Sequence, residues 1–118
     1  MDSPRRILLV EDEPDIAEML RFFLEQNGYV LLHAEDGQEA LRLTHEKMPH
    51  LILMDGILPD MDGFEVCQQL RAMPATAHIP IIFLTRRSGH DNVLAALELG
   101  ADDFIAKPFD PEEMLLRI

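Results

Sequence analysis

Five short apolar runs recur along the chain, and each is followed by a segment with helical features. The runs occupy residues 7–10, 30–32, 51–54, 79–84 and 104–106. Most are continuous rather than alternating, which is typical of strands covered on both faces, as in a parallel sheet. The last run is the weakest and fits an edge strand. Strand–helix repetition with short joins predicts right-handed βαβ units, with helices on both faces of the sheet.

The segments between the runs carry the start and stop signals of helices. Pro14 suits the first position of a helix, and Gly28 suits the position just past its end. Between them, apolar residues at i, i+3, i+4, i+7 and i+8 predict one buried stripe, formed by Ile16, Met19, Leu20, Phe23 and Leu24. Later segments open with cap-like pairs spaced three residues apart, which suit helix starts: Asp36 with Glu39, Asp62 with Glu65, Ser88 with Asp91, and Asp110 with Glu113.

Length and composition limit the classes of function. The 118 residues fit one compact domain, and 22 acidic against 10 basic residues give a formal net charge of −12. This charge disfavours nucleic acids and anionic membrane surfaces, because both are bound through Lys and Arg. The single cysteine, Cys67, cannot form a disulfide within the chain. We therefore expect a cytoplasmic domain over residues 1–118, whose last helix is cut short at Ile118 because the parent protein continues.

Polar residues gather at the carboxyl ends of the predicted strands. Glu11 and Asp12 follow the first run, Asp55 the third, Thr85 the fourth and Lys107 the fifth. In open α/β sheets, ligands bind outside this edge, at the point where the strand order reverses. Three carboxylates, a hydroxyl and an ammonium group are therefore predicted to converge there.

Three carboxylates in one pocket repel one another. Each ionised pair at about 5 Å costs roughly 3 kcal/mol at an effective dielectric constant near 20, so protons or a cation must offset the repulsion. Hard oxygen ligands select Mg²⁺ or Mn²⁺ over zinc. A carboxylate beside such a cation can attack phosphorus and form an acyl phosphate, whose oxygens Lys107 and Thr85 would bind.

Motifs in fixed order then point to a known family. Residues 11–12 (ED), 53–63 (LMDGILPDMDG), 81–85 (IIFLT) and 100–109 (GADDFIAKPF) resemble the receiver domain of two-component response regulators. The resemblance runs over essentially the whole chain. It implies an α/β fold of the flavodoxin-like (βα)₅ type, a doubly wound five-stranded parallel sheet with the strand order 2-1-3-4-5.

The resemblance assigns roles to the acidic residues. It implies that Asp55 accepts a phosphoryl group from a phosphohistidine on a sensor histidine kinase or a phosphotransfer protein. Asp12 and Asp55 would bind Mg²⁺ directly, together with the backbone carbonyl of Ile57. Glu11 would act on the ion mainly through water.

The same resemblance assigns phosphoryl contacts and a switch. Lys107 would contact the phosphoryl oxygens, and Thr85 and Phe104 match the family's switch pair, in which the hydroxyl moves to the phosphoryl group and the ring turns inward. Arg86 and Gly56 depart from the family's pattern, which favours a small residue at the first position and a larger apolar one at the second. We place both beside the phosphoryl group, and we expect the Arg86 side chain to alter the lifetime of the acyl phosphate.

The expected output is a rearrangement of the fourth helix, fifth strand and fifth helix, which would control an effector domain or partner. Asp102, Asp103 and Arg117 resemble charges that pair in dimers of winged-helix regulators, so a homodimer through this face is a further expectation. The chain would catalyse only its own phosphorylation and dephosphorylation.

One alternative function stays open and two others are disfavoured. The unusual Arg86 is compatible with a pseudo-receiver, which binds a partner independently of phosphorylation. The presence of Asp55, Thr85 and Lys107 argues against this alternative. A Mg²⁺-dependent phosphatase of small molecules is disfavoured, because Ile57 rather than a second acid stands two residues after Asp55. A nucleotide-binding domain is disfavoured as well, since neither glycine-rich phosphate motif occurs.

Overall fold

Five parallel strands form one sheet in the order β2-β1-β3-β4-β5. Their bounds are β1 (Arg6–Val10), β2 (Val30–Ala34), β3 (Leu51–Asp55), β4 (Ile81–Thr85) and β5 (Asp103–Ala106). The computed structural model describes residues 5–55, 58–85 and 102–106, with the backbone alone at residues 85 and 103–106. The predicted fold class and strand order are confirmed, and the last apolar run is indeed an edge strand.

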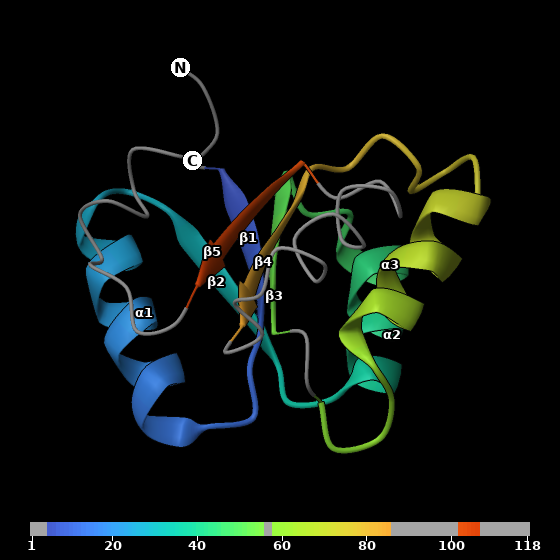
Figure 1. Cartoon of the computed structure of the whole chain (residues 1–118). Coiled ribbons are helices and arrows are strands. Elements are labelled where there is room, and N and C mark those ends of the chain that lie inside the picture. Colours follow the sequence, from blue (N-terminus) through green and yellow to red (C-terminus); the bar gives the residue numbers. More distant parts are fainter. Residues whose placement is uncertain (1–4, 56–57, 86–101, 107–118) are drawn as a thin grey trace.

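Helices cover both faces of this sheet. α1 lies on one side, and α2 and α3 lie together on the other (Figure 1). Their bounds are α1 (Pro14–Gln26), α2 (Gly37–Lys47) and α3 (Gly63–Ala72). The described chain therefore has the doubly wound arrangement expected for continuous apolar strands.

The predicted helix signals hold wherever the structure describes them. α1 begins at Pro14, and Gly28 has a positive φ of 89° just after its end. Asp36 caps α2 by accepting a hydrogen bond from the backbone N–H of Glu39 at 2.8 Å. Asp62 caps α3 through the backbone N–H of Phe64 at 2.9 Å. The helix starts predicted at Ser88 and Asp110 lie outside the described residues.

Alternate residues of each central strand enter different cores. Leu8 and Val10 of β1 pack toward α2 and α3, in a cluster that also contains Phe83. Ile7 and Leu9 of the same strand pack toward α1. Every second side chain points to the same face of a sheet, so a strand with both faces covered must be apolar at every position.

One residue of the predicted α1 stripe lies outside the core. Leu20 and Leu24 are fully buried, and Ile16 and Phe23 pack against them, but Met19 is 43% exposed. Met19 precedes Leu20, and consecutive residues are about 100° apart around a helix, so Met19 falls at the margin of the stripe.

The half-buried Arg71 connects the end of α3 to the segments that precede β4 and β5. Arg71 donates to the backbone carbonyls of Ala77 and Ile79 at 3.1 and 2.6 Å, and to Oδ2 of Asp102 at 3.0 Å. The same Asp102 oxygen accepts from the backbone N–H of Ile81 at 2.9 Å. Asp102 is thus engaged within its own chain, while the side chains of Asp103 and Arg117 lie outside the described part.

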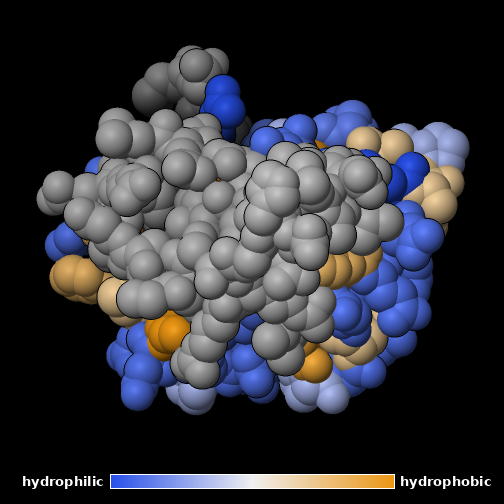
Figure 2. Space-filling view, viewed as in Figure 1, coloured by the Kyte–Doolittle hydropathy of each residue, from blue (hydrophilic) through white to orange (hydrophobic). Residues whose placement is uncertain are grey.

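The described residues visible on one face of the molecule are mostly hydrophilic (Figure 2). In the view of Figure 2, hydrophilic residues predominate around the lower and right-hand parts of the face, with apolar residues scattered between them. Among the described residues, no helix is long and apolar enough to cross a membrane.

The aromatic pair at the centre of the α2/α3 core provides a test of the packing. Phe83 is fully buried and meets Phe64 edge to face, with ring centroids 4.8 Å apart. Phe83→Ala should lower the free energy of unfolding by about 3–5 kcal/mol, because it removes the ring and leaves a cavity. Urea denaturation measures this change.

The matched control is Phe22→Ala on α1, where the ring is 66% exposed. That variant should change the free energy of unfolding by no more than about 0.5 kcal/mol. Equal losses in the two variants would contradict the assigned core.

Candidate functional site

Three carboxylates meet at the carboxyl edge of the sheet. Oxygen atoms of Glu11, Asp12 and Asp55 all lie within 4.8 Å of one another. Glu11 is fully buried and Asp55 is 5% exposed, whereas Asp12 is open to solvent. The predicted convergence of the three acids is therefore what the structure shows.

The register of two neighbouring strands brings the acids together. β1 and β3 pair in parallel, with Val10 opposite Met54 at their carboxyl ends. Glu11 directly follows Val10 and Asp55 directly follows Met54, so both acids come at the same level of the sheet. The position of the site thus follows from strand pairing rather than from a local motif.

Glu11 is held by β2 as well as by β1. Its backbone N–H donates to the carbonyl of Ala34 at 3.0 Å, and its own carbonyl accepts from Nε2 of His33 at 2.8 Å. The Glu11 carboxylate accepts from the backbone N–H of Glu13 at 3.3 Å. His33 is half-buried and supports the acid, a role that no motif around it indicates.

The donor set fits a hard divalent cation. Three carboxylates within 4.8 Å, two of them buried, offer only oxygen atoms, and no other described set of acids, histidines and cysteine forms such a group. Each ionised pair at this spacing repels by roughly 3 kcal/mol at an effective dielectric constant near 20. Mg²⁺ suits such a site because it is bound by one or two carboxylates and keeps several waters.

The loop that leaves Asp55 is anchored by a further acid. Asp60 accepts hydrogen bonds from the backbone N–H groups of Gly37 and Gln38. Burial acts to raise the pKa of Asp60, but these two hydrogen bonds, together with those from the backbone N–H groups of Asp60 and Met61, outweigh it and hold the pKa below its ordinary value of 3.8. Any stability that this adds is present above about pH 4 and is lost as the pH falls through the lowered pKa. No sequence pattern around Asp60 indicates this contact with α2.

The remaining predicted site residues are described in part or not at all. Thr85 ends β4, one residue beyond the partner of Asp55, and Phe104 lies in β5 opposite Phe83. The structure describes their backbone only. The other predicted contacts, at Gly56, Ile57, Arg86 and Lys107, lie outside the described residues.

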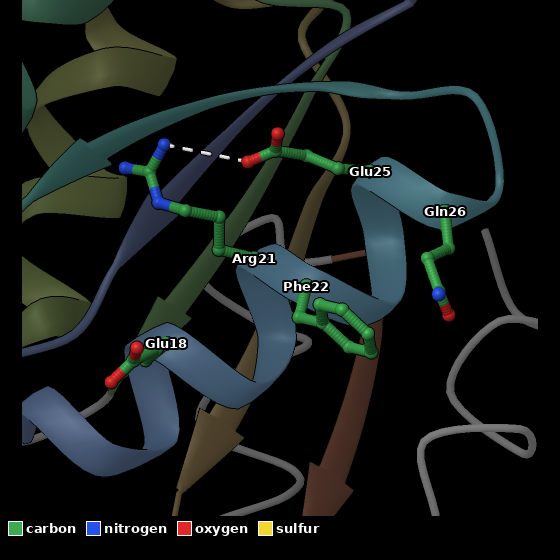
Figure 3. A pocket seen from close by; sticks show the side chains of 5 residues that line it. All are labelled: Glu18, Arg21, Phe22, Glu25 and Gln26. Carbon is green, nitrogen blue, oxygen red and sulfur yellow. Dashed lines mark ion pairs between the residues drawn. The ribbon is translucent and has the colours of Figure 1, made fainter.

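Two surface depressions lie on or beside α1. One of about 320 Å³ is bordered by Asp12, Glu18 and His33, next to the acidic cluster. The other, of about 470 Å³, is lined along α1 by Glu18, Arg21, Phe22, Glu25 and Gln26 (Figure 3). Its ion pair between Arg21 and Glu25 spans 3.5 Å and is about half exposed, so it contributes little to stability. Its side chains form no set that could bind a metal ion.

Cys67 has a packing role. It lies fully buried in the α2/α3 core. Burial raises the pKa of its thiol. The charge of Arg71 acts to lower this pKa, and the charge of Asp102 acts to raise it further. A buried, protonated thiol is a poor nucleophile.

Comparison with known proteins agrees with the geometry. The family described as "Response regulator receiver domain" matches residues 7–118. The chain is 45% identical, over 97% of its length, to the phosphate regulon transcriptional regulatory protein PhoB of Escherichia coli (strain K12), and it covers 50% of that protein. It is 42% identical to the DNA-binding dual master transcriptional regulator RpaA of Synechocystis sp., covering 96% of this chain and 47% of that protein.

Solved structures show the same fold. A putative response regulator from Chloroflexus aurantiacus superposes with a TM-score of 0.92 at 36% identity, over 98% of this chain and 94% of that one. The receiver domain of the Pseudomonas aeruginosa sensor histidine kinase PA1611, solved with a magnesium ion coordinated in its active site cleft, gives 0.89 at 32% identity, with coverage of 98% and 94%. The chain spans about half the length of the curated relatives that it matches.

Binding of Mg²⁺ should stabilise the folded chain through these acids. At a free concentration one hundred times the dissociation constant, the stabilisation is about 2.7 kcal/mol. Asp55→Asn should abolish most of it, because the buried carboxylate is lost from the cluster. Thermal unfolding with and without Mg²⁺ measures both effects.

Glu25→Gln is the control, since it removes one acidic charge from the exposed groove of α1. It should respond to Mg²⁺ as the unchanged chain does. A response that is lost equally in both variants would show that general charge, not the cluster, binds the ion.

Proposed function

The chain belongs to the response regulator receiver domain family of two-component systems, and from this premise we propose that Asp55 is its phosphoacceptor. One observation carries the proposal: Asp55 is a nearly buried carboxylate that ends β3 within 4.8 Å of two further acids. A carboxylate so placed lies where open α/β sheets bind their ligands.

The proposed reaction moves one phosphoryl group. A carboxylate oxygen of Asp55 attacks the phosphorus of a phosphohistidine, and a new O–P bond forms as the P–N bond breaks. The imidazole nitrogen keeps the electron pair of that bond and then takes a proton. Hydrolysis of the acyl phosphate by water later returns the Asp55 carboxylate and inorganic phosphate.

The other residues support the transfer. Asp12 and Asp55, with the backbone carbonyl of Ile57, would hold Mg²⁺, and Glu11 would act mainly through water. When bound, the ion neutralises the acids and the charge that develops on the phosphoryl oxygens.

The phosphoryl group itself would be bound from the β4 and β5 side. Lys107 and the Thr85 hydroxyl would bind the equatorial oxygens, and Arg86 and Gly56 would contact the group from the neighbouring loops. Thr85 would then move together with Phe104, so that phosphorylation changes the face that contains β5.

The proposed phosphoacceptor function also implies partners. We propose a cytoplasmic chain that receives phosphoryl groups from a sensor histidine kinase or phosphotransfer protein and controls an effector domain or partner. The relatives named above are transcriptional regulators about twice as long, which supports an effector beyond this domain. A homodimer through the face containing β5 is the corresponding proposal for assembly. The chain would catalyse only its own phosphorylation and dephosphorylation.

The acceptor is tested with acetyl phosphate. The unchanged chain incubated with acetyl phosphate and Mg²⁺ should gain one phosphoryl group by intact-mass spectrometry, and hydroxylamine should remove it because the product is an acyl phosphate. Asp55→Asn should abolish the gain, whereas Glu25→Gln should retain it. Equal labelling of Asp55→Asn would place the acceptor elsewhere, whereas no labelling of the unchanged chain would favour the pseudo-receiver.

Arg86 is tested by the lifetime of the product. Arg86→Ala should shorten the half-life of the acyl phosphate by up to about fivefold, because a charge pair with the group, or a screen beside it, is lost. The control is Arg87→Ala, which removes the adjacent charge. Timed mass spectra after removal of acetyl phosphate measure the decay, and an unchanged half-life in Arg86→Ala rejects the role.

A further inference from the structure

The loop between Asp55 and α3 is fastened to the start of a different helix. The backbone N–H of Gly37 donates to Oδ1 of Asp60 at 2.7 Å, and the backbone N–H of Gln38 donates to Oδ2 at 3.0 Å. Both carboxylate oxygens are therefore used, each by a separate N–H group. The first N–H groups of a helix have no partner within the helix, so they are free to bind an acid from outside.

An apolar contact joins the same two segments. A Cβ atom at Gly37 would overlap Cγ and Sδ of Met61, and it would lie 3.0 Å from Cγ2 of Val66. Glycine therefore permits the loop to approach α2 closely. The polar contact of Asp60 and the apolar contact of Met61 come from adjacent residues and reach the same residue of α2. We call the two hydrogen bonds from Gly37 and Gln38 to Asp60 the Asp60 clamp.

The Asp60 clamp spans the strands that carry the acidic cluster. Asp55 ends β3, α2 follows β2, and β1 lies between these two strands with Glu11 at its carboxyl end. α2 and α3 lie side by side on the same face (Figure 1). The clamp thus joins the β3 side of the cluster to the β2 side.

Resting on the proposed phosphoacceptor function, we infer that Asp60 is a positioning residue for Asp55. Asp60 lies five residues after Asp55 and binds the start of α2. These bonds hold the end of β3, and with it Asp55, in the geometry that binds Mg²⁺ and receives the phosphoryl group. Functional groups must be held to within about 0.5 Å by their surroundings, and loss of a supporting hydrogen bond around a metal ligand typically costs 10–100-fold in affinity or activity.

A simple capping role for Asp60 is the competing explanation. α2 already has its own N-cap, because Asp36 accepts from the backbone N–H of Glu39 at 2.8 Å. Asp36 and Asp60 therefore bind the first turn of the same helix and carry the same charge. Asp60 belongs to the loop that leaves Asp55 and accepts two of these bonds, whereas Asp36 directly precedes α2 and accepts one. Asp36→Ala is consequently the matched control.

The experiment compares Asp60→Ala, Asp60→Asn and Asp36→Ala in the 118-residue chain. Calorimetric titration gives the Mg²⁺ dissociation constant, and acetyl phosphate labelling gives the initial rate at saturating Mg²⁺. Asp60→Ala should raise the dissociation constant about tenfold and slow labelling even at saturation. Asp60→Asn should give values between those of the unchanged chain and of Asp60→Ala, because its side chain keeps one of the two oxygens that accept from Gly37 and Gln38. Asp36→Ala should change both quantities by no more than about twofold.

A metal-free readout separates positioning from loss of the fold. By NMR hydrogen exchange without Mg²⁺, Asp60→Ala should speed exchange at the amides of Gly37 and Gln38 and at residue 55. Asp36→Ala should speed exchange at Glu39 and leave residue 55 unchanged. Both variants lose a helix cap, so their melting temperatures should fall by a similar few degrees.

Two results would overturn the inference, and they are distinguishable. If Asp60→Ala and Asp36→Ala match in Mg²⁺ affinity, labelling rate and exchange at residue 55, Asp60 is only a cap and the proposed function stands. If the unchanged chain neither binds Mg²⁺ nor takes a phosphoryl group, the proposed function and this inference both fail.

Discussion

The gathering of three carboxylates at the ends of β1 and β3 is the constraint on which the rest of the structure depends. Glu11 and Asp55 are almost fully buried, where ionised groups are costly unless something compensates their charge. The sheet can hold them there because Val10 and Met54 pair directly below them within an apolar core. Stability gained from the core is therefore what keeps like charges close enough to share a cation.

The same requirement explains why the strands are apolar throughout. Helices on both faces leave no solvent-facing side for β1 and β3, so polar residues can appear only where the strands end. Each of these strands thus has its packing residues along its length and its reactive residues at its carboxyl end, rather than one kind on each face. A one-residue shift of β3 against β1 would separate Glu11 from Asp55 and would turn each side chain of β3 toward the opposite core. The register that packs the two cores therefore also fixes the site.

Much of the fold and of the acidic cluster could be predicted from the sequence, because both depend on the pattern of apolar residues and on where the strands end. Continuous apolar runs predicted the parallel sheet, and the acids directly after them, Glu11, Asp12 and Asp55, predicted the cluster that the structure shows. Contacts between distant loops could not be predicted in this way. Asp60 binds α2 across 23 positions and His33 binds Glu11 across 22, and neither spacing follows from a helix or strand period.

The way these acids are oriented bears on what the site can bind. Asp60, Asp36 and Asp62 each accept hydrogen bonds from backbone N–H groups at helix starts, and the Glu11 carboxylate accepts one from Glu13. A backbone N–H directs a carboxylate but brings no full positive charge, unlike an arginine or lysine. Asp36 and Asp60 are fixed to α2 in this manner, in a chain whose net charge is already −12. The three acids at the carboxyl edge of the sheet add to this negative field, which attracts a divalent cation.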